Sequence, residues 1–302
     1  MPELAAGGRR WQVAPGSNLL DALNAAGVAV LYSCRAGSCH ACLVRCEQGE
    51  PADAQPQALA PEARAEGWRL ACQCQVVSDL QVATFDPRRD ALQAQVIDAA
   101  WPSPHVLRLR VLPQRPLAYR AGQHLVLWLE GVARPYSLAS LPGEDRALEF
   151  HLDCRQPGAF IDAARGLVAG SSLGLGELHG GALHYDPAWH AQPLWLLAAG
   201  TGLAPLYGVL REALRQGHEG PIQLLHVASE HYQRAALEAL QAEHPGLQVQ
   251  YLAQLPASLR VPRRAVALLC GGPASVEAFA RALFMAGLPR SQQYADTFTP
   301  RR

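Results

Sequence analysis

The 302-residue sequence predicts a multidomain chain in which an α+β unit, a small antiparallel β-barrel and a doubly wound α/β unit follow one another. Three changes of pattern indicate this order. The first part combines a short helical pattern with short apolar runs, the middle alternates apolar and polar residues between turns, and the last alternates apolar runs with helical spacing. A polar, proline-containing stretch at 86–90 is typical of a linker. The expected units are therefore residues 1–86, 91–187 and 188–302.

The composition argues against several classes of protein. The formal net charge is zero, whereas a nucleic-acid partner would favour a basic excess. The first residues lack the apolar core of a signal peptide, and the longest apolar run, 194–210, is interrupted by Gly200, Gly202 and Pro205. We therefore expect no membrane span and a soluble, cytoplasmic protein. In that compartment eight cysteines point to metal or redox chemistry more than to disulfides.

Three cysteines, Cys34, Cys39 and Cys42, lie in one short loop with the spacing C-x4-C-x2-C, and Cys72 follows later in the chain. This is the ligand spacing of a plant-type 2Fe–2S cluster. Zinc also accepts four thiolates, but its sites usually pair two C-x2-C units, and this stretch has one. The spacing therefore favours the iron–sulfur interpretation. Cys74 remains an alternative to Cys72 as the fourth ligand.

Local patterns predict the elements around this loop. Apolar residues at helical spacing indicate a helix over Leu19–Gly27, with Ser17 or Asn18 as its N-cap. The apolar run Val28–Tyr32 is expected to be a strand that leads into the cysteine loop. A second strand, Leu43–Cys46, is expected to leave it.

The middle unit contains residues suited to an aromatic ligand that carries phosphate. Arg134 is a permanent cation, Tyr136 offers a face for ring stacking, and Ser137 offers a hydroxyl for a ring nitrogen. Alternate side chains of a strand share a face, so Arg134 and Tyr136 should point to the same side. By themselves these residues are more typical of an ordinary surface strand.

The last unit contains two turns that follow apolar strands. The turn Gly200–Pro205 follows Leu194–Ala199 and opens a helix. Its missing side chains let phosphates approach the backbone at the positive end of that helix. It differs from the G-x-G-x-x-G fingerprint of dehydrogenases. The second turn, Cys270–Pro273, would by itself be an ordinary turn after a core cysteine.

The order of these features resembles the ferredoxin–NAD(P)H reductase family with an N-terminal plant-type 2Fe–2S ferredoxin domain, which includes reductase components of bacterial oxygenases such as phenol hydroxylase, methane monooxygenase and benzoate dioxygenase. The segment YSCRAGSCHACLVRCEQGEP resembles the cluster loop of that domain, and the family's motifs R-x-Y-S, G-T-G-x-A-P and C-G-x-P occur in the matching order. The resemblance implies a β-grasp ferredoxin domain over 1–86, an FAD-binding barrel over 91–187 and an NAD(P)H-binding α/β domain over 188–302.

The resemblance also implies the site residues. The implied cluster ligands are Cys34, Cys39, Cys42 and Cys72. The implied flavin contacts are Arg134, Pro135, Tyr136, Ser137, Gly158, Ala159 and Phe160. The implied nicotinamide-dinucleotide contacts are Gly200, Thr201, Gly202, Pro205, Cys270, Gly271, Gly272 and Pro273. Around the reacting rings, the implied catalytic positions are Ser137, Cys270, Asp296 and Phe298; the last two belong to a C-terminal segment that would otherwise be a frayed tail.

Three residues depart from the family pattern. His40 stands beside Cys39, where the family has glycine or another small residue, and we expect an exposed loop histidine more than one that tunes the cluster potential. Ile161 stands where serine or threonine is common, so a side-chain hydroxyl contact to the flavin is in question. Glu177 stands where proline is usual.

Cofactor choice is indicated by the segment after the second strand of the last unit. Glu230 would repel the extra phosphate of NADPH, and Arg234 lies further along, so we expect NADH in preference to NADPH. FAD is expected over FMN because the ferredoxin domain precedes the flavin domain, as in the family.

Taken together, the resemblance implies an NADH-dependent reductase that passes electrons through FAD and a 2Fe–2S cluster to an external acceptor protein, expected to be an oxygenase component. Two alternatives stay open at this point. One is a reductase for a deoxysugar dehydratase, which has the same architecture. The other is a redox-responsive binding protein that keeps the folds but lacks turnover.

Overall fold

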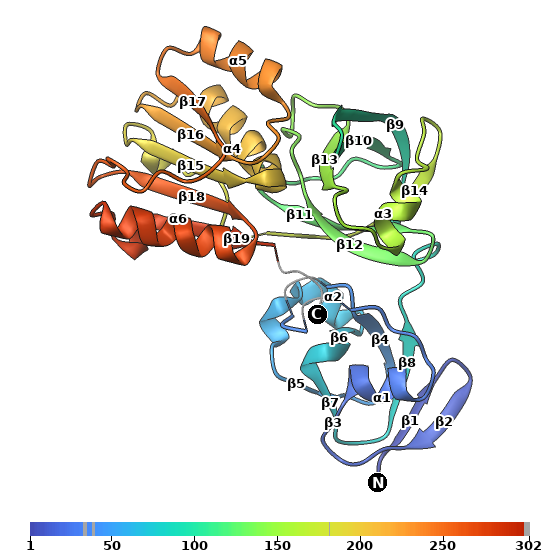
Figure 1. Ribbon diagram of the computed structural model, residues 1–302. Coiled ribbons are helices and arrows are strands. Elements are labelled where there is room, and N and C mark those ends of the chain that lie inside the picture. The colour runs from blue at the N-terminus through green and yellow to red at the C-terminus, as the bar shows by residue number, and fades with distance from the viewer. Residues whose placement is uncertain (33–34, 38–39, 181, 299–302) are drawn as a thin grey trace.

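The structure, a computed structural model, describes residues 1–32, 35–37, 40–180 and 182–298. Its elements gather into three bodies, each with its own principal sheet. Figure 1 shows the N-terminal body below, and the middle and C-terminal bodies side by side above it. The multidomain fold predicted from the sequence, with an α+β part, a β-barrel and a doubly wound α/β part, is confirmed.

The N-terminal body holds a mixed five-stranded sheet in the order β2-β1-β8-β4-β6, in which β1 and β8 run parallel. A small sheet, β3-β7-β5, lies beside it. Its core includes Leu4, Leu20 and Val44, all fully buried. The bounds are β1 Glu3–Ala6, β2 Arg9–Gln12, β3 Ser17–Asn18, α1 Leu19–Ala25, β4 Leu43–Gln48, β5 Ala52–Asp53, η1 Pro56–Ala58, α2 Pro61–Ala65, β6 Trp68–Leu70, η2 Ala71–Gln73, β7 Cys74–Val76 and β8 Leu80–Thr84.

Helix α1 confirms the predicted helix, and Asn18 is its N-cap because the side chain accepts a hydrogen bond from the Asp21 amide. The predicted strand Val28–Tyr32 is wrong: the segment has no regular structure. The Asn24 side chain hydrogen-bonds both backbone groups of Val30. It accepts from the Val30 amide at 3.0 Å and donates to the Val30 carbonyl at 3.2 Å. These bonds replace the partner that a strand would need.

The middle body is a six-stranded antiparallel sheet in the order β12-β11-β14-β9-β10-β13. A bridge between Leu138 and Phe150 brings the end of β12 to β13 and closes the barrel. Its apolar interior includes Leu109, Leu127 and Phe150. The bounds are β9 Leu92–Ser103, β10 Val106–Pro113, β11 His124–Leu129, β12 Val132–Ser137, β13 Leu148–Asp153, α3 Ala159–Ala164 and β14 Ser172–His179.

The C-terminal body is a parallel five-stranded sheet in the order β17-β16-β15-β18-β19. Leucine-rich β15 and β18 are buried in its centre, as expected of strands covered on both faces. The bounds are η3 Pro187–Trp189, β15 Leu194–Ala199, η4 Gly200–Gly202, α4 Leu203–Arg215, β16 Ile222–Val227, α5 Arg234–Glu243, β17 Leu247–Leu252, β18 Val266–Gly271, α6 Pro273–Met285, η5 Arg290–Gln292 and β19 Gln293–Thr297.

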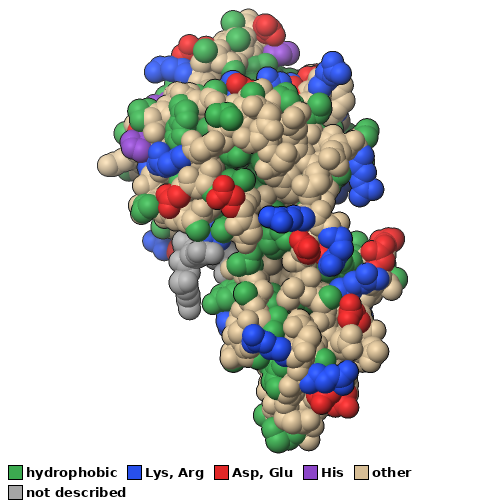
Figure 2. Space-filling model, turned by 90° about the vertical axis from the view of Figure 1, so that its right-hand side faces the viewer, with side chains coloured by type: hydrophobic (Ala, Val, Ile, Leu, Met, Phe, Trp, Pro, Cys, Tyr) green, Lys and Arg blue, Asp and Glu red, His purple; other side chains and the backbone are tan. Residues whose placement is uncertain are grey.

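The surface carries charges of both signs. Figure 2 shows acidic and basic side chains interspersed over one face, which matches the zero formal charge. Within the described residues, the helices are too short or too polar for any of them to cross a membrane.

Candidate functional site

The cysteine loop and the segment that follows β6 meet in the N-terminal body. Cys42 is buried, and its carbonyl accepts a hydrogen bond of 3.0 Å from the Ala71 amide, which brings Cys72 beside the loop. The Cys72 sulfur accepts a bond of 3.2 Å from the Gln73 side-chain amide. A sulfur that accepts hydrogen bonds suits a thiolate ligand, so this pair fits an iron–sulfur cluster. The other two predicted ligands lie outside the described residues: Cys34 and Cys39.

The neighbouring cysteines have a different environment. Cys74 is fully buried in the core, where burial raises the pKa of its thiol well above the ordinary value. Burial likewise raises the pKa of Cys46 to about 11. Both groups are therefore protonated at neutral pH, as expected of small core residues.

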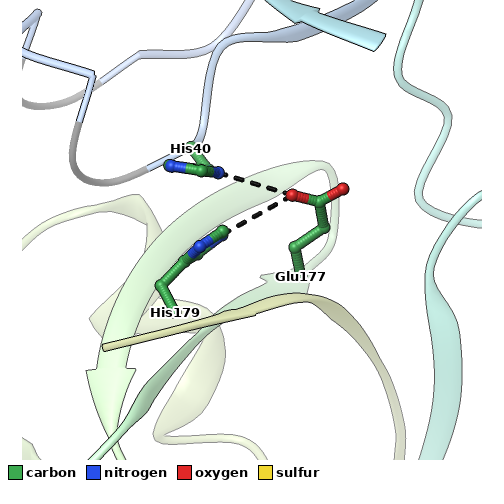
Figure 3. Close-up of side chains that lie close together, drawn as sticks. All are labelled: His40, Glu177 and His179. Carbon is green, nitrogen blue, oxygen red and sulfur yellow. Dashed lines mark hydrogen bonds and ion pairs between the residues drawn. The ribbon is translucent and has the colours of Figure 1, made fainter. Parts of the chain in front are cut away.

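The prediction that His40 is an exposed loop residue is wrong. Its side chain is only 4% exposed, because the cysteine loop rests on the barrel at this point. The ring contacts His179 of β14, with centroids 3.4 Å apart, and Nδ1 lies 3.4 Å from a carboxylate oxygen of Glu177 (Figure 3). Two of the departures noted in the sequence, His40 and Glu177, are thus neighbours in space.

The predicted flavin residues follow β12 and the turn before α3. Arg134 and Tyr136 are half-buried, and Ser137 is buried at the end of the strand. The Tyr136 ring packs beside Phe160, with centroids 5.2 Å apart, and burial raises the pKa of its phenol, which stays neutral. Gly158, just before α3, has open space where a side chain would stand. A cation, an aromatic face and an unobstructed backbone fit a flavin with its phosphates.

The position of Ile161 shows whether its departure from the family pattern removes a hydroxyl contact to the flavin. Its side chain packs against the apolar core of the barrel. An aliphatic side chain in that place cannot donate a hydroxyl to a ligand. The hydroxyl contact is therefore absent at this position, and the backbone of the turn, including that of Ala159, stays available to a ligand.

The two turns of the C-terminal body interlock at the carboxyl ends of β15 and β18. A side chain on Gly202 would collide with the backbone carbonyl of Cys270, and one on Gly271 would stand 2.7 Å from the Ala199 methyl group. Gly200 also has a left-handed φ of 54°. Glycine is therefore required on both sides of this junction. The predicted neighbours Thr201 and Pro205 lie in and after the first turn, and Gly272 and Pro273 open α6.

Of the four residues predicted around the reacting rings, three lie on strands β12, β18 and β19, and Phe298 directly follows β19. Cys270 and Asp296 face each other across β18 and β19, and the Phe298 amide donates to the Gly271 carbonyl at 2.8 Å. Residues Gln293–Thr297 form the fifth strand of the sheet, so the alternative of a frayed tail is wrong for them. Burial raises the pKa of Asp296, although the nearby charge of His124 opposes this shift.

His124 in turn connects this group to the barrel. It is the cross-strand partner of Ser137, the fourth of the residues predicted around the reacting rings. Because the charge of His124 acts on Asp296, the end of β12 and the C-terminal strand lie close to one another.

One basic residue near these turns was missed by sequence reasoning. A guanidinium nitrogen of Arg155 lies 3.3 Å from the position that a side chain on Gly200 would take. The Nε of Arg155 donates hydrogen bonds to both carboxylate oxygens of Asp153, which hold the side chain in place. A cation beside a glycine turn suits a phosphate ligand. Nothing in the sequence distinguishes Arg155 from other surface arginines.

Comparisons with known proteins agree with this geometry. Residues 5–77 match the 2Fe-2S iron-sulfur cluster binding domain, and residues 196–266 match the oxidoreductase NAD-binding domain. The reductase subunit of an aromatic O-demethylase from an Amycolatopsis species is 32% identical, with 98% of both chains covered. The chain belongs to this family of ferredoxin–NAD(P) reductases. The reductase component of the naphthalene 1,2-dioxygenase system of Pseudomonas putida is 30% identical over 94% of each chain.

Solved structures show the same arrangement. The crystal structure of the Amycolatopsis cytochrome P450 reductase GcoB superposes with a TM-score of 0.67 at 29% identity, and 99% of each chain is covered. The ferredoxin reductase of carbazole 1,9a-dioxygenase, at 21% identity, shares the fold with a TM-score of 0.63. The reductase described here is therefore an oxidoreductase that carries electrons from NAD(H) through FAD and a 2Fe–2S cluster.

Proposed function

We propose that this reductase supplies electrons from NADH to an oxygenase component, one electron at a time. The support comes from the junction where Gly202 packs on Cys270 and Phe298 bonds to Gly271, because this junction can hold a nicotinamide next to the end of β12. Family relatives named as reductase components of oxygenase systems support the choice of acceptor. A deoxysugar dehydratase has no such support.

We assign the three domains as the sequence suggested: a ferredoxin domain over 1–86, a flavin domain over 91–187 and a nucleotide domain over 188–302. The three principal sheets fall within these bounds. The cytoplasmic location expected from the sequence stays a prediction.

In this proposal the chain binds and orients, and the cofactors do the redox chemistry. When bound, the flavin would supply the conversion of a two-electron hydride from the nicotinamide into single electrons for the cluster. Arg134 neutralises a flavin phosphate, Tyr136 covers one face of the flavin ring, and Ser137 bonds a ring nitrogen. The glycine backbone of the first turn holds the dinucleotide phosphates. Cys270, buried and protonated, orients the nicotinamide by contact.

We also propose NADH as the preferred donor. The Glu230 carboxylate lies at the end of β16 and contacts His105 at 2.5 Å. The hydrogen bond from His105 lowers the pKa of Glu230, so the group is charged at neutral pH. A fixed negative charge there repels the additional phosphate of NADPH and can bond a ribose hydroxyl.

The visible spectrum of the purified protein, recorded without oxygen before and after NADH, tests the electron path. We expect both flavin and cluster absorbance to bleach, and NADPH to act much more slowly. If the protein holds both groups and NADH bleaches neither, the proposed path fails. The acceptor is tested separately by adding purified oxygenase components of the classes served by the relatives; rapid NADH oxidation coupled to product formation supports the choice, and reduction without any coupled oxygenase contradicts it.

A further inference from the structure

Three side chains from two domains meet where the cysteine loop rests on the barrel (Figure 3). His40 comes from the loop, and Glu177 and His179 come from β14. Nδ1 of His40 lies 3.4 Å from Oε2 of Glu177, and Nε2 of His179 lies 3.8 Å from the same oxygen. The three donor atoms all lie within 4.8 Å of one another.

Hydrogen bonding explains this arrangement poorly. Good hydrogen bonds between nitrogen and oxygen span about 2.7–3.2 Å, and both contacts to Glu177 are longer. Within the described part of the chain, the buried Nε2 of His179 has no hydrogen-bond partner. Its ring is 14% exposed and lies against the ring of His40. A neutral imidazole offers a lone pair on one of its two ring nitrogens, and the Nε2 of His179, which makes no hydrogen bond to any described residue, is in position to be that nitrogen.

The same distances suit a metal ion. Zinc binds imidazole nitrogen and carboxylate oxygen at about 2.0–2.2 Å, and the ligands of such a tetrahedron stand about 3.4 Å apart. The contacts of 3.4 and 3.8 Å to Glu177 are close to that separation. We propose that His40, Glu177 and His179 bind a zinc ion that joins the ferredoxin domain to the flavin domain, with the fourth position left for water.

The backbone of the loop is consistent with this role for His40. Its φ of 52° lies in the left-handed region, where glycine would be at ease and a side chain is less favourable. His40 and Glu177 stand 137 positions apart and both depart from the family pattern, yet their side chains meet. A ligand from each domain makes the site dependent on the docked position of the ferredoxin domain. Bound zinc therefore holds the cysteine loop on the barrel.

The direct test is a zinc titration of the full-length protein loaded with iron and flavin, after chelators have removed loosely bound metal. A competing chromophoric chelator gives the affinity, and elemental analysis gives zinc and iron per chain. We expect one tight zinc per chain in addition to the cluster iron. Glu177→Gln and His179→Gln should each bind zinc roughly tenfold or more weakly, because even residues behind a ligand change metal affinity that much.

A matched control is His190→Gln. His190 also lies 3.4 Å from a glutamate, Glu219, but that pair is on the surface of the nucleotide domain. It should keep the wild-type zinc affinity. Iron and flavin contents report whether each variant is folded, and both test substitutions are on β14, outside the domain that carries the cluster ligands.

X-ray absorption at the zinc edge of the wild-type protein gives a second readout that needs no variant. We expect only nitrogen and oxygen ligands at about 2.0–2.2 Å. A sulfur shell near 2.3 Å would mean that zinc occupies cysteines and would overturn the proposal. Finding no bound zinc in the iron-loaded protein would overturn it as well. So would equal zinc affinity in wild type, Glu177→Gln and His179→Gln.

Discussion

The flavin domain is joined to its two neighbours in different ways. Toward the nucleotide domain it shares a hydrophobic core, in which Val106, Ala121 and Leu141 of the barrel pack with Leu206 and Leu210 of α4. Toward the ferredoxin domain the apolar contact is a small separate cluster, and the core of the ferredoxin domain is its own. The small cluster includes Ala41, Ala91, Val126, Trp128 and Ala133, with Leu31 and Phe85 packed against them.

Polar contacts also differ between the two interfaces of the flavin domain. At the nucleotide side, Arg211 of α4 reaches Asp145 at 2.5 Å, and buried His151 bonds the hydroxyl of buried Tyr232 at 3.1 Å. At the ferredoxin side, the contact of His40 with Glu177 is longer. Hydride transfer needs two rings held at contact distance, and a continuous core provides that. The cluster must exchange electrons with the flavin and also with a partner, so a smaller interface suits the ferredoxin domain.

The largest effect is expected on NADH kinetics, from a substitution in the nucleotide domain. In Gly202→Ala the new methyl group meets the Cys270 backbone, which the central strand holds in place. The nicotinamide is then misplaced, and kcat/KM for NADH should fall roughly 100-fold, while flavin and iron contents stay near wild type. Gly246→Ala is the control, because its methyl group has room and the residue lies in the same domain. Equal kinetics in the two variants would show that the junction is adaptable.

The second largest effect is expected on stability, at the interface between the flavin and nucleotide domains. Leu141 is a barrel residue that is fully buried in the shared core, so Leu141→Ala should lower the free energy of unfolding by about 3 kcal/mol. Urea unfolding followed by circular dichroism and flavin fluorescence should show both domains weakened together. Leu112→Ala, at an exposed leucine of β10, should change little. Loss of flavin fluorescence without loss of nucleotide-domain structure would argue against a shared core.

The Arg211–Asp145 pair gives a pH-dependent effect. Burial opposes ionisation of Asp145, but hydrogen bonds from Arg211 and the Leu141 amide keep its pKa below the ordinary 3.8. Its contribution is therefore complete above pH 3.8 and is lost as the pH falls through the folded-state pKa. The free energy of unfolding of the wild-type protein should exceed that of Asp145→Asn by about 1–2 kcal/mol at pH 6. This difference should shrink below pH 4. Glu144→Gln, an exposed neighbour of the same arginine, should cost less; a constant difference across this pH range would remove the ionic explanation.

The smallest effect on stability is expected at the ferredoxin side. Phe85 stacks on Trp128 across this interface, with centroids 4.8 Å apart and planes at 24°. Phe85→Ala should cost about 1 kcal/mol and loosen the docked position. Reduction of cytochrome c, which needs the cluster, should fall several-fold, whereas NADH oxidation by a small dye that accepts from the flavin should be unchanged. Trp101→Ala, at an exposed tryptophan, is the control; a stability loss as large as that of Leu141→Ala would erase the contrast between the interfaces.

Much of this architecture could be predicted because its signals are local. The strand β15 occupies the predicted residues, and α1 and β4 begin at the predicted ones, since apolar runs and helical spacing report which side of a segment is buried. The turn at Gly200 was recognisable from its glycines after an apolar strand, whereas the turn Cys270–Pro273 was distinguished only by the family resemblance. The errors arose where a side chain or a domain outside the segment intervened. The Asn24 side chain bonds the backbone of Val30 and prevents a strand there, and packing of the cysteine loop on the barrel buries His40.

The sequence by itself determined the order of the three domains, the candidate ligands Cys34, Cys39, Cys42 and Cys72, and the glycine turns, because each depends on residue type and spacing along the chain. Only the tertiary structure decided what surrounds them. It joined the flavin and nucleotide domains through one core and brought His40 to Glu177. Burial and contact across such distances depend on how whole domains pack, and no local pattern records that packing.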